Sequence, residues 1–189
     1  MECEGVEEAR ISGNGRVVAF SSHANGLVPE DDNNVPDIFV HEIETGVTER
    51  VSVPTGGGDG YRPEDRACGR NGQCFWAIAS QVPSISHDGR LVAFHSGAPL
   101  LYPGDEDAKY GGDDDLFVHD RVTTTTLLVN RLPNGTPSGA PNLNAGSISS
   151  NGRWVTYTSD GRIAAADNDA DEDVFLQRLP RAPWRANPE

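Results

Sequence analysis

The sequence predicts an all-β fold: a segment of a β-propeller with about three four-stranded antiparallel blades, the last of them incomplete. Three observations predict this fold. A sequence unit that begins near Ile11 occurs again near Ile85 and near Ile148. Each copy contains an Asn-Gly or Asp-Gly pair, which is typical of hairpin turns. The residues after each pair alternate as in a β-strand, whose successive side chains point to opposite faces of a sheet.

The first unit shows the expected order of elements. Its Asn14-Gly15 pair predicts a two-residue type I′ turn, in which both residues have positive φ. A strand over 17–20 follows, then a long acidic loop and a third strand over 37–40. The sequence ETGVT predicts a further turn, and ERVSV, residues 49–53, predicts the fourth strand. The same turn is expected at Asp88-Gly89 and at Asn151-Gly152.

The boundaries of the units follow from this order. The anchors Ile11, Ile85 and Ile148 lie 74 and 63 residues apart, so the differences in length belong to loops. The prediction is one propeller unit over 1–189, with blade 1 at about 8–53, an insertion at 54–80, blade 2 at about 81–132, blade 3 at about 141–180 and a Pro-rich tail at 181–189.

One small sheet cannot bury both of its faces, whereas sheets stacked face to face can. Radial stacking gives a propeller, which the identical turn chemistry favours, and the alternative is a sandwich of three small sheets. The third unit ends after its third strand, because RAPWRANPE has no alternating pattern. The chain is therefore expected to be part of a propeller, a half-ring that closes with another copy, or a truncated product without independent function.

The composition of the chain disfavours some classes of binding partner. The chain has 189 residues with 36% hydrophobic residues, too many for a disordered chain, and a net charge of −14. This charge repels nucleic acid and disfavours anionic membrane surfaces. No run of 18 apolar residues occurs, so no membrane span is expected. The N-terminus MECEGVEEAR is not a signal peptide. Either the protein stays inside the cell, or the chain is a mature or trimmed fragment.

The three acidic loops are the candidate metal sites. Positions are counted from the first acid of each loop. In the third loop, acids occupy positions 1, 3, 5 and 7. The first loop follows the same spacing, with the backbone carbonyl of Val35 available at position 5. Alternate oxygens in a tight loop suit Ca²⁺, which takes six to eight oxygen ligands. The predicted ligands are Asp31, Asn33, Asp37, Asp105, Asp107, Asp115, Asp167, Asp169, Asp171 and Asp173.

The alternative for these loops is structural. Asp and Asn form turns because their side chains bond nearby backbone N–H groups, and the remaining charges would be solvated. The third loop favours calcium most, since four carboxylates this close repel one another without a cation. Elsewhere, Cys68 and Cys74 bracket an Asn-Gly turn, so they form either a small disulfide or two free thiols.

Other residue types give no catalytic pattern. His41 and His119 occupy equivalent strand positions, where Gln177 stands in the third copy, and this suits an exposed strand face. Trp154 has a side chain that can stack on a sugar or a peptide, but it lies in a strand of core type, so we expect it to pack in the core. No G-x-S-x-G nucleophile motif occurs. The sequence therefore predicts a protein that is not an enzyme.

Three segments, each with a turn and the strand after it, resemble the repeats of TolB-like propeller blades, a bacterial family similar to WD repeats. They are ISGNGRVVAFSS, ISHDGRLVAFHS and ISSNGRWVTYTS. The loop and strand NGLVPEDDNNVPDIFVHEIETGVTERVSV is similar to a subtype of these blades, and the resemblance covers most of 9–180. It implies a periplasmic or extracellular bacterial setting, where Ca²⁺ and a disulfide are compatible.

The expected function is a non-catalytic module, with Ca²⁺ in its acidic loops, that binds a protein or a glycan or assembles with other copies of itself. The alternative is the partial propeller of a secreted hydrolase or lyase, or of a peptidase-associated domain.

Overall fold

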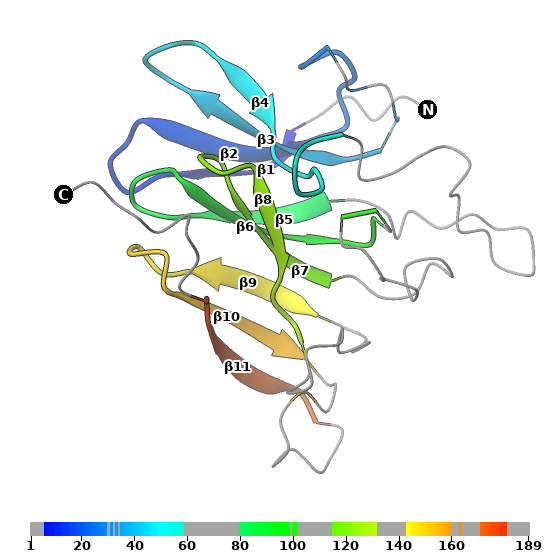
Figure 1. Cartoon of the computed structure of the whole chain (residues 1–189), viewed down its shortest axis with the longest axis vertical. Coiled ribbons are helices and arrows are strands. Elements are labelled where there is room, and N and C mark those ends of the chain that lie inside the picture. The colour runs from blue at the N-terminus through cyan, green and yellow to red at the C-terminus, as the bar shows by residue number, and fades with distance from the viewer. Residues whose placement is uncertain are drawn as a thin grey trace, which may run out of the picture.

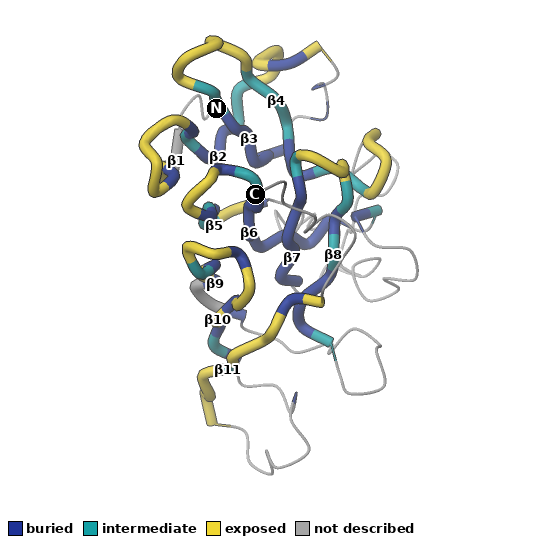
Figure 2. The backbone as a smooth tube through the Cα atoms, turned by 60° about the vertical axis from the view of Figure 1, so that its left-hand side comes forward, coloured by how far each residue is buried: buried dark blue, intermediate teal, exposed yellow. Residues whose placement is uncertain are grey.

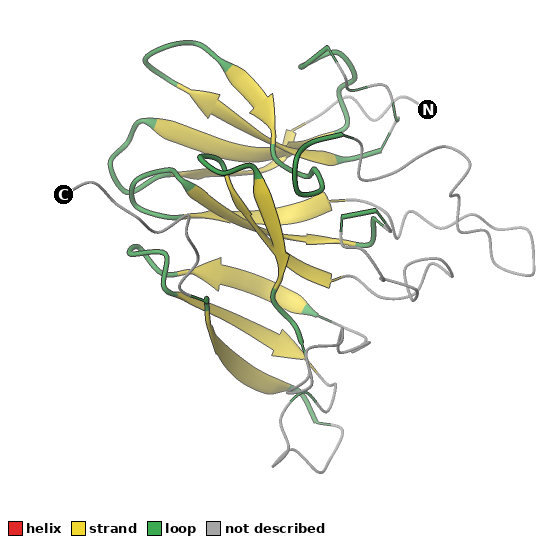
Figure 3. Cartoon of the chain, in the orientation of Figure 1, coloured by secondary structure: helices red, strands yellow, loops and turns green. Residues whose placement is uncertain are grey.

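The computed structural model describes residues 6–29, 31, 33, 35–58, 80–98, 100–101, 115–131, 143–159, 163 and 171–180. Three antiparallel sheets stack in chain order along the long axis of the molecule (Figure 1). The described residues contain strands, turns and loops and no helix (Figure 3). The predicted all-β fold with three blades, the last one incomplete, is confirmed.

Each sheet is a meander in which neighbours in sequence pair. The first sheet contains β1 (Val6–Ile11), β2 (Val17–Ser22), β3 (Asp37–Glu42) and β4 (Thr48–Arg50). The second contains β5 (Ser80–Ile85), β6 (Leu91–Ser96), β7 (Asp115–Asp120) and β8 (Thr125–Leu128). The third contains β9 (Asn144–Ile148), β10 (Trp154–Ser159) and β11 (Asp173–Arg178).

The hairpin turns differ from the type I′ prediction. Ser12 N–H donates to Val17 O at 2.8 Å, so this bonded pair closes a loop of four residues, 13–16, between β1 and β2. In this turn only Gly15, with φ of 72°, has positive φ. The Ser12 hydroxyl accepts from Val17 N–H at 3.0 Å and donates to the Asn14 side chain at 2.7 Å. These side-chain bonds stabilise a wider turn, which is why the two-residue prediction was wrong.

The same turn closes the first hairpin of the other two sheets. Ser86 and Asp88 repeat the bonds of Ser12 and Asn14, and so do Ser149 and Asn151. The serine, the Asn or Asp, and the glycine of the repeated sequence therefore each have a defined place in the turn. The arginine that follows donates its backbone N–H to the Asn or Asp side chain in all three copies.

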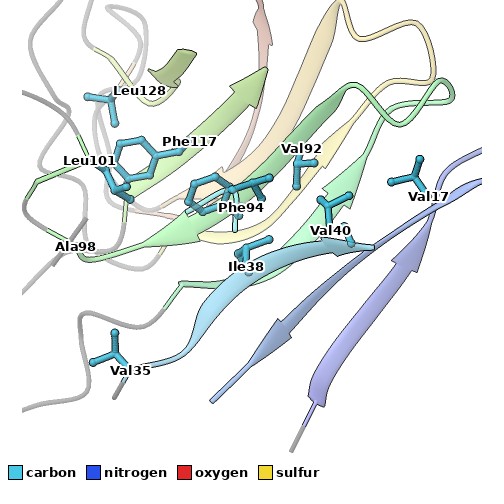
Figure 4. Close-up of a cluster of buried hydrophobic side chains, with 12 residues drawn as sticks. Val17, Val35, Ile38, Val40, Val92, Phe94, Ala98, Leu101, Phe117 and Leu128 are labelled. Carbon is cyan, nitrogen blue, oxygen red and sulfur yellow. The ribbon is translucent and has the colours of Figure 1, made fainter. Parts of the chain in front are cut away.

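Two apolar clusters hold the sheets together. We call the side of a sheet that faces the next sheet its forward face; in the first sheet it contains Val17, Ala19, Ile38 and Val40. We call the opposite side the rear face; in the second sheet it contains Val92, Phe94 and Phe117. The first cluster joins these two faces (Figure 4). The second cluster joins the forward face of the second sheet, with Leu91, Ala93, Leu116 and Val118, to the rear face of the third, with Val155, Tyr157 and Phe175.

Stacked aromatic rings recur on each rear face. The Phe94 and Phe117 ring centroids lie 5.8 Å apart, and those of Tyr157 and Phe175 lie 5.4 Å apart. Burying aromatic side chains of this size contributes on the order of 2 kcal/mol each. The recurrence shows that both junctions between sheets are built on one plan.

Polar contacts also cross the first junction. Arg121, at the turn after β7, donates to Glu42 at 2.7 Å, to the carboxylate of Glu49 and to the carbonyl of Gly89 at 2.9 Å. The chain after β4 then runs beside β8, where Thr126 N–H donates to the Thr55 hydroxyl at 3.1 Å. The first two sheets are thus joined at both their cores and their edges.

Candidate functional site

The first acidic loop brings its three predicted ligands into one polar cluster. Asp37 begins β3, and its carboxylate accepts from the Asn33 side chain at 2.9 Å and from the Ser52 hydroxyl at 2.5 Å. Asp31 lies within the same cluster, 3.6 Å from the guanidinium of Arg50. All three predicted ligands are buried.

Arg50 supplies positive charge where calcium was predicted. Its Nη1 atom lies 3.2 Å from Asp37 Oδ2, and its side chain is 4% exposed. Burial raises the pKa of Asp37, while the hydrogen bond from Ser52 and the charge of Arg50 oppose this shift. A guanidinium and a Ca²⁺ ion would compete for the same carboxylates, so the described part of this loop does not fit a calcium ion.

Sequence reasoning missed Arg50 because it lies on a different strand from the acids. β4 pairs with β3 so that Arg50 stands opposite Phe39. In the second sheet, Leu128 stands opposite Phe117 instead. The register of β4 against β3 places the cation of Arg50 beside Asp37. The spacing of acids along the sequence carries no information about this register.

The second loop keeps part of this arrangement. Asp115 begins β7, and its carboxylate accepts from the side chain of Asn130. The Asn130 side-chain oxygen in turn accepts from Leu116 N–H at 2.8 Å, the role that Ser52 plays for Ile38. Asp105 and Asp107 lie outside the described residues.

In the third loop, Asp171 and Asp173 are exposed, and Asp167 and Asp169 lie outside the described residues. Within the described residues, no group of three or more His, Cys, Asp or Glu is placed to hold a metal ion. Calcium in the second and third loops stays a prediction. The pair Cys68 and Cys74 also lies outside the described residues.

His119 has a structural role, and the expectation that it lies on an exposed strand face was wrong. His119 is buried, and its Nδ1 lies 2.8 Å from the Thr126 hydroxyl. It is covered because the segment after β4 packs along β8, where Thr126 donates to the carbonyl of Val53. Burial lowers the pKa of His119 to about 4.

His95 links the second and third sheets. Its Nε2 accepts from Gly146 N–H at 2.9 Å, and burial lowers its pKa to about 4. A ring nitrogen that accepts a hydrogen bond must be unprotonated, so His95 is neutral in the folded chain. These two imidazoles are occupied by packing and hydrogen bonding and are not placed as catalytic bases.

The forward face of the third sheet is open. Trp154 is 39% exposed, Val174 76% and Leu176 61%, whereas their counterparts in the first two sheets are buried. Figure 2 shows β11 mostly in the exposed colour, whereas β6 and β7 of the second sheet have the buried colour. Ile148, Trp154 and Leu176 also line a groove of about 340 Å³.

The expectation that Trp154 packs in the core was therefore wrong. Its strand pattern is that of Val17 and Leu91, but the described residues include no next sheet to cover it. The guanidinium of Arg178 lies over the indole at 5.8 Å from the ring centroid. Such a contact contributes about 0.5–1 kcal/mol at an exposed site and leaves the apolar face uncovered.

The opposite end of the stack is open as well. Ile11 is 60% exposed and Ile43 52%, whereas the equivalent Ile148 and Leu179 of the third sheet are buried against the second. One end of the described stack thus exposes a forward face, and the other end exposes the side that packs against a forward face at the internal junctions.

Comparison with known proteins agrees with this architecture. TolB from Acinetobacter baumannii matches with a TM-score of 0.50 and 13% identity, over 93% of this chain and 32% of TolB. The fold is that of TolB-like propeller blades. The chain spans about a third of the length of TolB. The predicted resemblance is confirmed for the fold.

Two further solved structures match less closely. The β-propeller domain of the Trilobed protease from Pyrococcus furiosus matches with a TM-score of 0.46 and 12% identity, over 95% of this chain and 44% of that one. A prolyl endopeptidase matches with a TM-score of 0.49 and 14% identity, over 92% of this chain and 20% of that one. No protein-family model and no curated protein matches the chain.

Proposed function

We propose that the chain is a non-catalytic propeller module that binds a protein or a glycan or assembles with other copies of itself. The observation that carries this proposal is the open forward face of the third sheet. Its apolar side chains occupy positions that the first two sheets bury, so covering them with a partner removes apolar area from water. An extracellular or periplasmic setting is part of the same proposal. The described part of the chain contains no helix long and apolar enough to cross a membrane.

The described polar groups favour binding over catalysis. The buried imidazoles of His95 and His119 each have a hydrogen-bond partner within the fold. The buried carboxylate of Asp37 is held by Arg50, Ser52 and Asn33. Catalysis needs a base within reach of a substrate, and these groups face other protein groups instead.

The experiment for this function combines a binding screen with amide hydrogen exchange. The purified chain is screened against a glycan array and a peptide library, and exchange is followed in β10 and β11 as the concentration of each ligand, or of the chain itself, is raised. Protection of these two strands by any of them supports the proposal. Equal exchange under all conditions, or turnover of a peptide or polysaccharide in the same screen, would overturn it.

Calcium belongs to this proposal in the third loop. Asp171 and Asp173 are exposed there, and Ca²⁺ is a divalent ion that carboxylate oxygens at this spacing suit. Ligand binding to the folded state raises the melting temperature. We expect Ca²⁺ to raise it relative to EGTA, and the double substitution Asp171→Asn with Asp173→Asn to abolish the rise.

The matched control for calcium is Asp31→Asn. This substitution weakens the contact with Arg50, so it should lower the melting temperature equally with Ca²⁺ and with EGTA. A rise that survives in the double variant would refute calcium at Asp171 and Asp173. The alternative, a propeller that serves a hydrolase, a lyase or a peptidase, stays a prediction that the turnover assay tests.

A further inference from the structure

We propose that a second copy of this chain docks head to tail, with the exposed end of its first sheet on the open forward face of the third. The inference rests on the proposed binding function and names both the surface and the partner. It starts from the two junctions inside the chain, which show what covers a forward face.

The internal junctions follow one rule at the hairpin turn. The first forward-face residue of β2, Val17, packs against Gly89 of the next sheet, where an added Cβ would lie 2.5 Å from Val17 Cγ2. Leu91 packs in the same way against Gly152, where an added Cβ would lie 2.6 Å from Leu91 Cδ1. A side chain from one sheet therefore fills the space that the glycine of the following turn leaves.

The two halves of a third such contact are present at opposite ends of the chain. Trp154 is the equivalent of Val17 and Leu91, and it is exposed. Gly15 is the equivalent of Gly89 and Gly152, and among the described residues no neighbouring atom lies within 4 Å of the position of an added Cβ. The space beside Gly15 of a second copy accommodates the indole of Trp154, which is larger than either aliphatic counterpart.

The isoleucines at this end extend the match. At the internal junctions, Ile85 packs against the first cluster, and Ile148 and Leu179 are part of the second. Their equivalents in the first sheet, Ile11 and Ile43, are exposed. In the head-to-tail pair these two side chains cover Val174 and Leu176, as Ile148 and Leu179 cover the forward face of the second sheet.

Backbone bonds at the turns also cross both internal junctions, and their acceptors stand at one turn position although their donors stand at two. Asn14 N–H donates to the carbonyl of His87, and His87 N–H donates to the carbonyl of Ser150, both at 2.9 Å. The next acceptor in this series is the carbonyl at the His87 position of a following sheet. In a second copy that position is Gly13, whose carbonyl is therefore the acceptor expected at the junction between chains.

A second copy is favoured over an unrelated partner because this chain itself carries the complementary end. The junction is heterologous, since one copy uses Val174 and the other uses Ile11. A heterologous contact leaves a free end on each partner, so it closes a ring or builds a filament. An isologous contact, in which one face meets the same face of the partner, lacks the glycine-to-side-chain match of the internal junctions.

The test uses two charge substitutions at exposed positions and one control. Val174→Lys alters the open forward face, and Ile11→Lys alters the opposite end. Val122→Lys changes an exposed apolar residue at the turn after β7, away from both ends. Sedimentation velocity is measured for each protein from low to high micromolar concentration, and thermal melting checks that each variant folds.

The wild-type chain and Val122→Lys are expected to associate equally, and each of the other variants to associate about tenfold more weakly. Mixing Val174→Lys with Ile11→Lys decides the geometry. Each variant keeps the half that the other has lost, so the mixture forms a one-to-one complex that is tighter than the association of either variant alone. A complex in the mixture supports the head-to-tail contact.

Three results would overturn the inference: a wild-type chain that stays monomeric throughout, association that Val174→Lys leaves unchanged, or association that Ile11→Lys leaves unchanged. A monomeric chain whose β10 and β11 are protected by a glycan or peptide would overturn the self-association alone and leave the proposed binding function standing. A monomeric chain that no ligand protects would overturn both.

Discussion

Acidification should weaken the junction between the second and third sheets, because His95 is held there as a neutral imidazole. Burial lowers its pKa from 6.5 to about 4, and its Nε2 accepts from Gly146 N–H. A histidine with a lowered pKa contributes its full stability above about pH 6.5 and loses it as the pH falls toward about 4, because the unfolded chain binds the proton first. Between about pH 7 and about pH 5, this difference lowers the free energy of unfolding by about 2 kcal/mol.

The assay is urea unfolding of the wild-type chain and of His95→Gln at both pH values. A glutamine side-chain oxygen still accepts from Gly146 N–H but takes up no proton in this range. The other titrating groups, including Asp37, are common to both proteins and cancel in the comparison. We expect the variant to lose about 2 kcal/mol less than the wild type on acidification. Equal losses in the two proteins would refute the argument that a buried neutral His95 couples the sheets to pH.

The remaining predictions concern single contacts. Gly152→Ala should cost about 3 kcal/mol, because it adds a clash to a strained φ, whereas Gly15→Ala should cost about 1 kcal/mol for the φ alone; urea unfolding compares them. Arg50→Met should cost about 3–5 kcal/mol by the same measurement, because buried carboxylates lose their counter-charge, and a loss below about 1 kcal/mol would contradict this. Arg121→Gln should cost at most about 1 kcal/mol, since its Glu partners are more than a third exposed, and added salt should reduce the difference from wild type; an effect that salt leaves unchanged would assign it to packing.

Much of the fold could be predicted because each unit repeats the same turn residues and the same strand pattern. The turn glycines Gly15, Gly89 and Gly152 and the alternating strands after them fix where hairpins form, and three copies of one hairpin require stacked sheets. The type of turn was not readable from the Asn-Gly pair. It depends on the hydroxyl of a serine two residues earlier, such as Ser12, which forms side-chain bonds that favour the wider connection.

The candidate site was less predictable, because its decisive contacts join residues from different strands. Counting positions along the first loop identified Asp31 and Asp37 but not Arg50, whose place depends on the pairing of β3 with β4. Burial was misjudged for a related reason. The sequence around His119 is typical of an exposed strand face, but the segment after β4 covers this residue. The sequence around Trp154 is typical of a buried strand face, but no described sheet covers it.

The shared turn geometry has a consequence for how such a chain changes over time. The constant hairpins lie on one side of the stack, while β2, β6 and β10, which precede the acidic connections, end on the other (Figure 1). Insertions in those connections therefore alter one rim of the molecule without shifting the contacts between neighbouring sheets. A gene that duplicates one repeat inherits a ready junction with its neighbours, and each new copy is free to acquire its own loop.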